Sequence, residues 1–320
     1  MTLPPSTQPH DTAPTVPADV VVVGSLNMDL VVRTPRLPQP GETLTGHGFT
    51  TTAGGKGANQ AVALARLGTA TAMVGCVGDD DYGHALRDGL EREGIHCQGI
   101  RRCGEQPTGV AVIQVDDDSR NSIVVTPGSN GELTPADVEG CDALLASARL
   151  VICQLETPLA TVRHALERAR HHGCLTLLNA APAMSLPRDL LALVDWLVVN
   201  ESEAAALSGQ TVTHPDEAAR AVQCLRKAGC RQVLITLGAQ GVVAAVDDRL
   251  HHYAARPVTA MDTTAAGDTF VGAFAAALSR GEGIEAAIRY GQAAAAIAVT
   301  RAGAQASIPR HDEILPPAHS

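Results

Sequence analysis

A run of small residues that ends in an acid occupies positions 262–270, with the sequence Asp262-Thr263-Thr264-Ala265-Ala266-Gly267-Asp268-Thr269-Phe270. It opens a predicted helix over 267–279. Small residues at a helix start leave backbone N–H groups and the positive end of the helix dipole facing one spot, which suits an anion. Asp268 then has two interpretations. It could be a helix N-cap or a first-turn acid, or it could be a general base beside an oxyanion, as phosphoryl transfer to a hydroxyl requires.

A glycine-rich run, Gly54-Gly55-Lys56-Gly57-Ala58-Asn59-Gln60-Ala61, leads into a predicted helix over 58–67. It is not a Walker A loop, because Lys56 is followed by glycine rather than Ser or Thr. Glycines at a helix start leave N–H groups free and let a ligand approach the backbone closely. Lys56 adds a positive charge, and Asn59 offers the donor and acceptor that a sugar hydroxyl needs. A plain helix start is the alternative.

Polar residues follow two predicted strands in the first half of the chain. Asn27 and Asp29 come after the strand at 20–23 and alternate, so both could point to one side and hold neighbouring sugar hydroxyls. Glu156 lies just past the strand at 150–155. Open α/β sheets bind ligands at the carboxyl ends of their strands, so these residues indicate a ligand site there.

Two more motifs lie in the second half of the chain. Asn200-Glu201-Ser202-Glu203 follows a strand at 196–199, and alone it is an ordinary capped helix start. Thr236-Leu237-Gly238-Ala239-Gln240-Gly241 is either a hairpin or a loop that lets a nucleotide lie against the backbone. No Gly-x-Gly-x-x-Gly follows the first strand, which disfavours a dinucleotide-binding dehydrogenase.

The elements that must position these residues alternate between short apolar runs and amphipathic stretches, the pattern of a doubly wound, mostly parallel α/β sheet flanked by helices. We expect strands at Val20–Val23, Ala72–Val77, Leu150–Leu155, Leu175–Leu178, Trp196–Val199 and Gln232–Leu237, and helices at Ala58–Leu67, Gly83–Glu93, Pro158–His171, Asp216–Ala228, Gly267–Ser279 and Ile284–Val299. Two extended segments, 29–52 and 108–125, break the pattern. They could pair into a small second sheet acting as a lid, with two unrelated hairpins as the alternative.

Composition excludes several classes of protein. A net charge of −10 without a Lys/Arg cluster argues against nucleic acid as a partner, and the apolar runs are too short to span a membrane. Residues 1–17 lack an apolar core, so we expect a disordered tail rather than a secretory signal. The eight cysteines form no Cys-x-x-Cys pair and fit buried thiols of a reducing cytosol. We expect a cytoplasmic protein with one domain at 18–312 and a second tail at 313–320.

Taken together, these residues resemble the ribokinase-like carbohydrate kinase family over roughly residues 18–312. The resemblance rests on two specific motifs in the right order, Gly54–Gly68 and Asp262–Phe270. It implies ATP-dependent, Mg²⁺-assisted phosphorylation of the 5-hydroxyl of D-ribose, a doubly wound domain with a β lid, and a homodimer in which two lids clasp. Asn27 and Asp29 with Glu156 favour ribose. A sibling kinase for 2-deoxyribose, fructose or a nucleoside, and a non-catalytic sugar sensor, are the alternatives.

The resemblance also implies a role for each matched residue. Asp268 would deprotonate the sugar, with Ala265, Ala266 and Gly267 as the anion hole. The sugar would be held by Asn27, Asp29, Gly55, Lys56, Asn59, Glu156 and Asp268, and the nucleotide by Asn200, Thr236, Leu237, Gly238, Ala239, Gln240, Gly241, Gly267 and Gln292. K⁺ would bind at Asp262, Thr264, Ala298, Arg301, Gly303 and Ser307, and Glu203 would act on Mg²⁺ indirectly.

Two positions depart from the family pattern. Gln292 stands where relatives commonly have Asn or His. The run Asn179-Ala180-Ala181-Pro182 replaces the usual Asn-Pro-Ala-Pro, and we interpret it as a loop change without catalytic weight.

Overall fold

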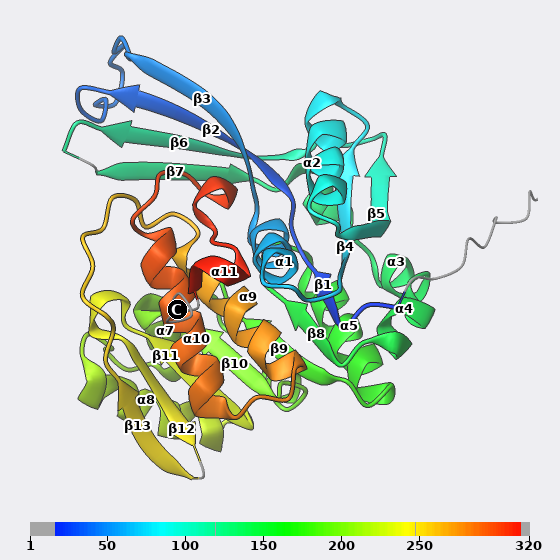
Figure 1. The fold of residues 1–320 in the computed structure, drawn as a ribbon. Helices are drawn as coiled ribbons and strands as arrows, with labels where there is room; N and C mark the ends of the chain where they lie inside the picture. The colour runs from blue at the N-terminus through cyan, green and yellow to red at the C-terminus, as the bar shows by residue number, and fades with distance from the viewer. Residues whose placement is uncertain (1–16, 119, 247, 315–320) are drawn as a thin grey trace, which may run out of the picture.

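The computed structural model describes residues 17–118, 120–246 and 248–314. Its centre is a nine-stranded sheet in the order β13-β12-β11-β10-β9-β8-β1-β4-β5 (Figure 1). The strands are β1 (Val20–Val23), β4 (Thr71–Gly78), β5 (His96–Cys103), β8 (Leu150–Cys153), β9 (Leu175–Asn179), β10 (Trp196–Val199), β11 (Gln232–Thr236), β12 (Val242–Val246) and β13 (Arg249–Tyr253). The last two strands pair antiparallel and the others parallel.

Helices cover both faces of this sheet, as a doubly wound fold requires. One face carries α1 (Lys56–Arg66), α2 (Asp81–Arg92), α9 (Ala266–Ser279) and α10 (Ile284–Ala298). The other carries α3 (Pro135–Glu139), α4 (Asp142–Ser147), α5 (Leu159–His171), α6 (Arg188–Leu191), α7 (Glu201–Ser208) and α8 (Pro215–Lys227). Short 3₁₀ turns at η1 (Gly128–Glu132), η2 (Gly238–Gln240) and η3 (Gln305–Ser307), and the last helix α11 (His311–Ile314), complete the order.

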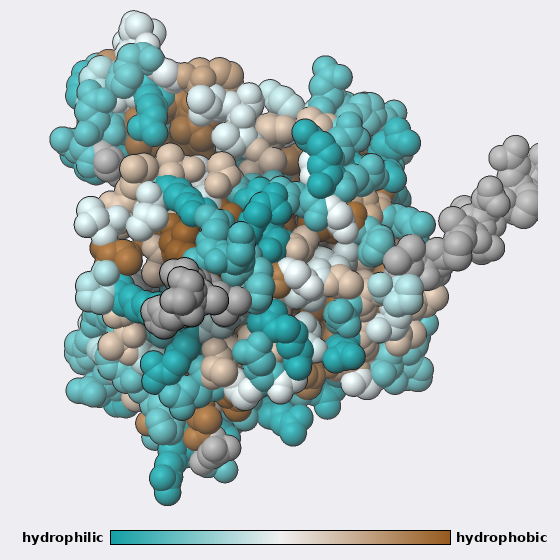
Figure 2. Space-filling model, viewed as in Figure 1, coloured by the Kyte–Doolittle hydropathy of each residue, from teal (hydrophilic) through white to brown (hydrophobic). Residues whose placement is uncertain are grey.

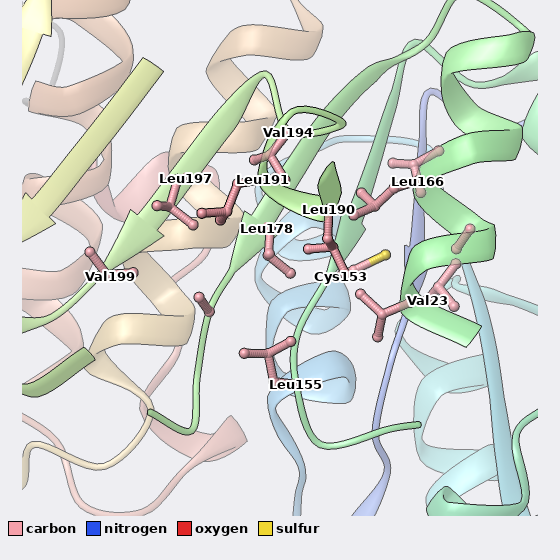
Figure 3. Close-up of a cluster of buried hydrophobic side chains, with 14 of the residues drawn as sticks. Val23, Cys153, Leu155, Leu166, Leu178, Leu190, Leu191, Val194, Leu197 and Val199 are labelled. Carbon is pink, nitrogen blue, oxygen red and sulfur yellow. The ribbon is translucent and has the colours of Figure 1, made fainter. Parts of the chain in front are cut away.

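The buried side chains form one apolar layer on each face of the sheet. Along β1, Val21 and Val23 enter one layer while Val20 and Val22 enter the other, because side chains alternate along a strand. Figure 3 shows Val23, Cys153 and Leu178 of neighbouring strands packed near Leu166 of α5. The layers consist mainly of Ala, Val and Leu, which agrees with the low aromatic content. Small core residues let helices lie close to the sheet.

A second sheet projects from the carboxyl edge of the first, at the upper left of Figure 1. Its order is β3 (Gly48–Gly54), β2 (Asn27–Thr34), β6 (Gly109–Asp116) and β7 (Asn121–Thr126). The central pair β2–β6 is parallel and the outer pairs are antiparallel. The two extended insertions therefore pair with one another, and the interpretation as two unrelated hairpins was wrong.

The predicted fold class is confirmed, and each predicted strand and helix is present; Val20–Val23 and Trp196–Val199 match at both ends, and the ends of the others differ by no more than two residues. The prediction omitted β5, β12, β13 and several short helices. Most of the predicted tails at 1–17 and 313–320 lie outside the described residues, although 313 and 314 belong to α11. Among the described residues, no helix combines the length and hydropathy needed to cross a bilayer. The cysteines described here are free thiols, six of them buried.

Candidate active site

The direction of the chain changes between β1 and β8, since the chain leaves β1 toward β4 and later returns to β8 on the other side. In folds of this kind ligands bind at the carboxyl ends of two such strands, and the region around these ends is called the crevice below. Ser25 follows β1, and its hydroxyl donates to Oε2 of Glu156, which follows β8, over 2.5 Å. The same oxygen accepts the backbone N–H of Lys56 at 3.2 Å. The crevice thus brings the first strand, the glycine-rich run and Glu156 together.

Asn27 and Asp29 lie at the start of β2, where the second sheet leaves the crevice, and both side chains are buried. The amide of Asn130 in η1 donates to Oδ1 of Asn27 at 2.7 Å. Asn130 also bonds both backbone groups of Leu26, at 2.9 and 3.0 Å. This buried amide fixes the orientation of Asn27. Sequence reasoning missed Asn130, because it lies in an irregular turn that carries no periodic signal.

The carboxyl group of Asp29 lies in an unusual electrostatic environment. Its burial, and then the neighbouring charges of Glu156 and Asp268, raise the pKa of its carboxyl from 3.8 to about 7. None of the hydrogen bonds found in the described residues satisfies this carboxylate. Its oxygens are therefore available to hydroxyl donors of a ligand.

Lys56 is a cation close to the acids Asp268, Glu156 and Glu203. Burial by itself lowers the pKa of its amine, but Asp268, Glu156 and Glu203 outweigh that effect and raise it. Lys56 therefore stays protonated and offsets part of the negative charge. It follows Gly55, whose φ of 89° lies in the left-handed region that favours glycine. This turn lets β3 run directly into α1 at the crevice.

Asp268 is held by the first turn of α1. Its Oδ2 accepts the side-chain amide of Asn59 at 3.0 Å, and its Oδ1 accepts that of Gln60 at 2.9 Å. Helices α1 and α9 come this close at Gly272, where a Cβ would lie 2.5 Å from Cβ of Ala63. The carboxylate is buried and forms no cap to its own helix in the described part of the chain. Asp268 is thus not the N-cap of α9, although it is an acid in the first turn of that helix.

The start of α9 provides free backbone donors beside this acid. Ala265 adopts a left-handed conformation with φ of 57°, which turns the chain into the helix. Within the described residues, the N–H groups of Ala265, Gly267 and Asp268 have no protein acceptor, whereas that of Ala266 donates to the carbonyl of Thr263 at 3.2 Å. An anion can bind the three free groups at the positive end of the helix dipole. The family resemblance implied that the N–H of Ala266 also belongs to the anion hole, but in this conformation that N–H already donates to the carbonyl of Thr263.

A cavity of about 570 Å³ lies on the far side of this helix start. Its walls are mostly small or apolar and are built by Thr236, Gly238, Ala239, Gly241, Val242, Ala255, Arg256, Pro257, Val258, Ala260, Thr263, Ala266, Gly267, Phe270, Gln292, Ala295, Ala296 and Val299. Its size is typical of a site for a small molecule or cofactor. Gly267 lines the cavity and Asp268 follows it in the chain, so the cavity reaches the free N–H groups next to the buried carboxylate.

The segment 236–241 is both a hairpin turn between β11 and β12 and part of this wall. Two of its six residues do not line the cavity: Leu237 is buried in the core, and the amide of Gln240 donates to the carbonyl of Thr213. Gln292 does line the cavity, and its Nε2 donates to the carbonyl of Tyr253 at 2.7 Å. Gln292 therefore braces the cavity wall at the end of β13.

Asn200 and Glu203 form a reciprocal cap at the start of α7. The backbone N–H of Asn200 donates to Glu203 at 2.9 Å, and the N–H of Glu203 donates to Oδ1 of Asn200 at 2.9 Å. The pKa of Glu203 is raised, with burial as its main cause. Asn200 does not line the cavity. Glu203 lies close enough to Lys56 and Asp268 to influence the charge of the site.

Of the six residues assigned to a monovalent cation, Ala298 ends α10, and the other five belong to two loop segments that are bonded together, one before α9 and one after α10. Asp262 accepts the N–H and hydroxyl of Thr264 at 2.9 and 2.6 Å, and the N–H of Gly303 at 2.9 Å. Burial raises the pKa of Asp262, but these bonds outweigh it and leave the pKa below its ordinary value. Ser307 is fully buried in the second loop, while the side chain of Arg301 turns away to pair with Glu313.

The second loop is also tied to α1. Arg66, in the last turn of that helix, donates to the carbonyls of Gln305 and Ile308 at 2.6 and 2.8 Å. Its guanidinium also pairs with Glu93 at 2.6 Å. One helix therefore contacts the crevice at its start and this loop at its end.

The model of the family described as pfkB family carbohydrate kinases matches residues 17–311. The chain belongs to this family. This pfkB-family chain is 43% identical to ribokinase of Haemophilus influenzae over 296 residues, which cover 92% of the chain and 97% of that relative. It is 37% identical to deoxyribokinase of Salmonella typhimurium over 292 residues, covering 91% and 95%. The structure of Arabidopsis thaliana ribokinase complexed with ribose and ATP superposes with a TM-score of 0.86 at 32% identity, covering 93% and 98%.

Proposed function

We propose that this carbohydrate kinase transfers the γ-phosphoryl group of ATP to the 5-hydroxyl of D-ribose. The observation that carries the proposal is the buried carboxylate of Asp268 beside the free N–H groups at the start of α9. A crevice rich in acids and amides lies on one side of this pair, and the apolar cavity lies on the other. The relatives named ribokinase, and the similar structure with ribose and ATP bound, support the same assignment.

Ribose fits the crevice because its hydroxyls need both donors and acceptors. Asp29 supplies acceptor oxygens, Lys56 supplies donors, and the buried Oδ1 of Asn59 has no partner among the described residues. The adenosine of ATP fits the apolar cavity, with its phosphates directed at the free N–H groups of α9.

The chemical step follows from this arrangement. The carboxylate of Asp268 accepts the hydroxyl proton as the bond between the hydroxyl oxygen and the γ-phosphorus forms. The bond from that phosphorus to the β,γ-bridging oxygen breaks, and ADP leaves with the electron pair. The N–H groups of Ala265 and Gly267 stabilise the charge on the transferring group. Asn200 and Glu203 would act on Mg²⁺ indirectly, and the ion, when bound with ATP, would supply further neutralisation of the phosphate charge.

A panel of acceptors tests the assignment. In a coupled assay of ADP release, ribose should give the highest kcat/KM among pentoses, hexoses and nucleosides. The deoxyribokinase relative makes 2-deoxyribose the sharpest competitor, and it should be poorer because it lacks a hydroxyl that Asp29 could bind. Preference for 2-deoxyribose would make the chain a sibling kinase, and no ADP release with any acceptor would refute the kinase proposal.

We also propose that the two bonded loops around Asp262 hold K⁺. One carboxylate, the hydroxyls of Thr264 and Ser307 and the backbone carbonyls suit a large, weakly hydrated ion. The described residues contain no cluster of three or more His, Cys, Asp or Glu side chains that would favour a transition metal. Replacing Na⁺ by K⁺ at constant ionic strength and fixed Mg²⁺ should raise the rate several-fold, and Asp262→Ala should remove that response while Glu282→Ala keeps it. Direct K⁺ binding, followed by the melting temperature, provides a readout independent of turnover.

We propose that the second sheet is a lid that also mediates a homodimer. Phe49, Val112 and Val124 share one face of the sheet and are exposed, at 64, 38 and 64%. Figure 2 shows hydrophobic residues gathered over this part of the molecule. Contiguous exposed apolar residues mark interaction surfaces. Sedimentation of wild type and of Val124→Lys tests this: wild type should be a dimer and the variant a monomer, whereas a monomeric wild type would refute the proposal.

A further inference from the structure

Behind Asp268, away from the crevice, three side-chain amides form a continuous buried chain of hydrogen bonds. Nε2 of Gln60 donates both to Oδ1 of Asp268, at 2.9 Å, and to Oδ1 of Asn179, at 3.0 Å. The amide of Gln154 donates to Oε1 of Gln60 at 2.7 Å. Gln60 is fully inaccessible to solvent, and Gln154 and Asn179 are also buried. Nothing in the proposed reaction so far uses these three residues.

The direction of every bond in this chain is fixed by one backbone group. The amide nitrogen of Asn179 donates to the carbonyl of Val198 in β10 at 3.0 Å. A carbonyl can only accept, so the oxygen of Asn179 must face Gln60. Gln60 must then present its nitrogen to that oxygen, and the second hydrogen of the same nitrogen points to Asp268. The carbonyl of Val198 in the central sheet therefore determines that Gln60 presents a donor to Oδ1 of Asp268.

Gln154 holds the other end of the Gln60 amide. Its own Oε1 has no partner among the described residues, so this orientation leaves a buried acceptor unsatisfied. An unsatisfied buried polar atom costs free energy and persists where something else requires it. Here the requirement is a donor to Oε1 of Gln60, which would otherwise be a buried acceptor without a partner.

We propose that Gln60 is a positioning residue that anchors Oδ1 of Asp268 and thereby makes Oδ2 the atom that accepts the sugar proton. Among the described residues, Oδ2 accepts a hydrogen bond from Asn59 alone, and Oδ1 of Asn59 has no partner there. Asn59 can exchange its bond to Asp268 for bonds to the sugar, whereas Gln60 has no contact that a sugar could replace. The carboxylate keeps its orientation while the proton moves from the hydroxyl to Oδ2. This inference rests on the proposed role of Asp268 as the base.

The test compares Gln60→Met with Gln154→Met. The first substitution removes both bonds donated by Gln60 at nearly constant volume, and the second makes the same chemical change one step farther away and leaves those bonds in place. Losing a hydrogen bond to a charged group should lower kcat of Gln60→Met by about 10–100-fold. The KM for ribose should stay within about threefold, because Gln60 does not contact the sugar. Gln154→Met should lose less than about fivefold in kcat.

Three further measurements complete the test. Melting temperatures establish that each variant is folded, and titration calorimetry with ribose measures binding apart from turnover. If Gln60→Met does not fold, Gln60→Glu keeps the side-chain shape but replaces the donor by an acceptor, and it should lose at least as much kcat. Asp268→Asn, assayed alongside, tests the base itself.

The outcomes are distinguishable. A kcat of folded Gln60→Met within threefold of wild type would overturn the positioning role, even with Asp268→Asn inactive. A rise in the ribose KM of Gln60→Met equal to its loss of kcat would make Gln60 a sugar ligand instead. An active Asp268→Asn would refute the base, and with it the proposed mechanism.

Discussion

The crevice and the cavity on either side of α9 are built by opposite means. The crevice is lined by buried carboxylates, an ammonium group and amides, held in place by side chains from α1, from η1 and from the segments that follow β1 and β8. The cavity is lined mainly by small and apolar residues, with its one amide, Gln292, bonded to the backbone. The crevice can discriminate hydroxyl patterns, because a missing hydroxyl leaves a buried group unpaired. The cavity recognises its ligand through shape and backbone, so single side chains should matter less there.

The largest expected effect is at the boundary between the two regions. Asp268→Asn keeps the shape and the neighbouring amides but cannot accept the hydroxyl proton. Turnover should fall by about 10²–10⁴-fold, while ATP binding measured by calorimetry stays unchanged. A variant within threefold of wild type would mean that the boundary residue is not the base.

The second-largest effect is expected for a substitution in the crevice, which should change the KM for ribose and not that for ATP. Asp29→Ala removes a carboxylate that none of the described hydrogen bonds satisfies. Losing a charged hydrogen bond to the sugar should raise the KM for ribose by about 10–100-fold, with little change in the KM for ATP. Equal increases in the KM for ribose and the KM for ATP would contradict the assignment of Asp29 to the sugar alone.

The acidity of the crevice should appear as a pH dependence. Because the pKa of Asp29 is about 7 without sugar, the carboxyl is mostly protonated at pH 6 and mostly ionised at pH 8. Two sugar hydroxyls can both donate only to the ionised form, so the KM for ribose should rise about tenfold from pH 8 to pH 6. The KM for ATP, corrected for its own ionisation, should not follow the same curve.

Asp29→Asn provides the matched control for that pH profile, since it keeps the shape and removes the titration. Its KM for ribose should no longer vary with pH. A carboxyl whose folded pKa lies above its unfolded value costs stability once it is ionised, and this cost grows as pH rises from about 4 to 7. The sugar-free variant should therefore melt at a higher temperature than wild type at pH 8 and not at pH 4. Identical melting at both pH values would contradict the raised pKa.

The smallest effect is expected in the cavity. Gln292→Ala removes neutral hydrogen bonds to the backbone of the cavity wall. The shorter of the two, at 2.7 Å to the carbonyl of Tyr253, should dominate and contribute about 0.5–1.5 kcal/mol, so the KM for ATP should rise by about two- to tenfold and the ribose KM should remain unchanged. A 100-fold loss would show that this side chain reads the nucleotide directly.

Most strands of the central sheet could be predicted from the sequence, because they are short apolar runs that alternate with amphipathic helices, whose apolar residues recur with the helical period. It omitted β5, whose residues include His96, Arg101 and Arg102, because an edge strand with charged residues lacks that signal. The acids of the site were found through their places at strand and helix ends. The amides that orient them were not, because a buried Asn or Gln has no characteristic spacing. Gln60 was part of the glycine-rich run, but no role was assigned to it. Asn179 was considered only as part of a loop that departs from the family pattern.

The two attachments of α1 limit how this chain can vary in length. Asn59 and Gln60 in its first turn contact Asp268, and Arg66 in its last turn contacts the loop at 305–308. Each added residue turns an α-helix by about 100° and lengthens it by about 1.5 Å. A single insertion between residues 60 and 66 would therefore turn Arg66 away from its carbonyls or pull the amides from Asp268. The connection between β2 and β3, whose middle is exposed, carries no such double constraint. Relatives should differ in length there and keep the spacing from residue 59 to residue 66 constant.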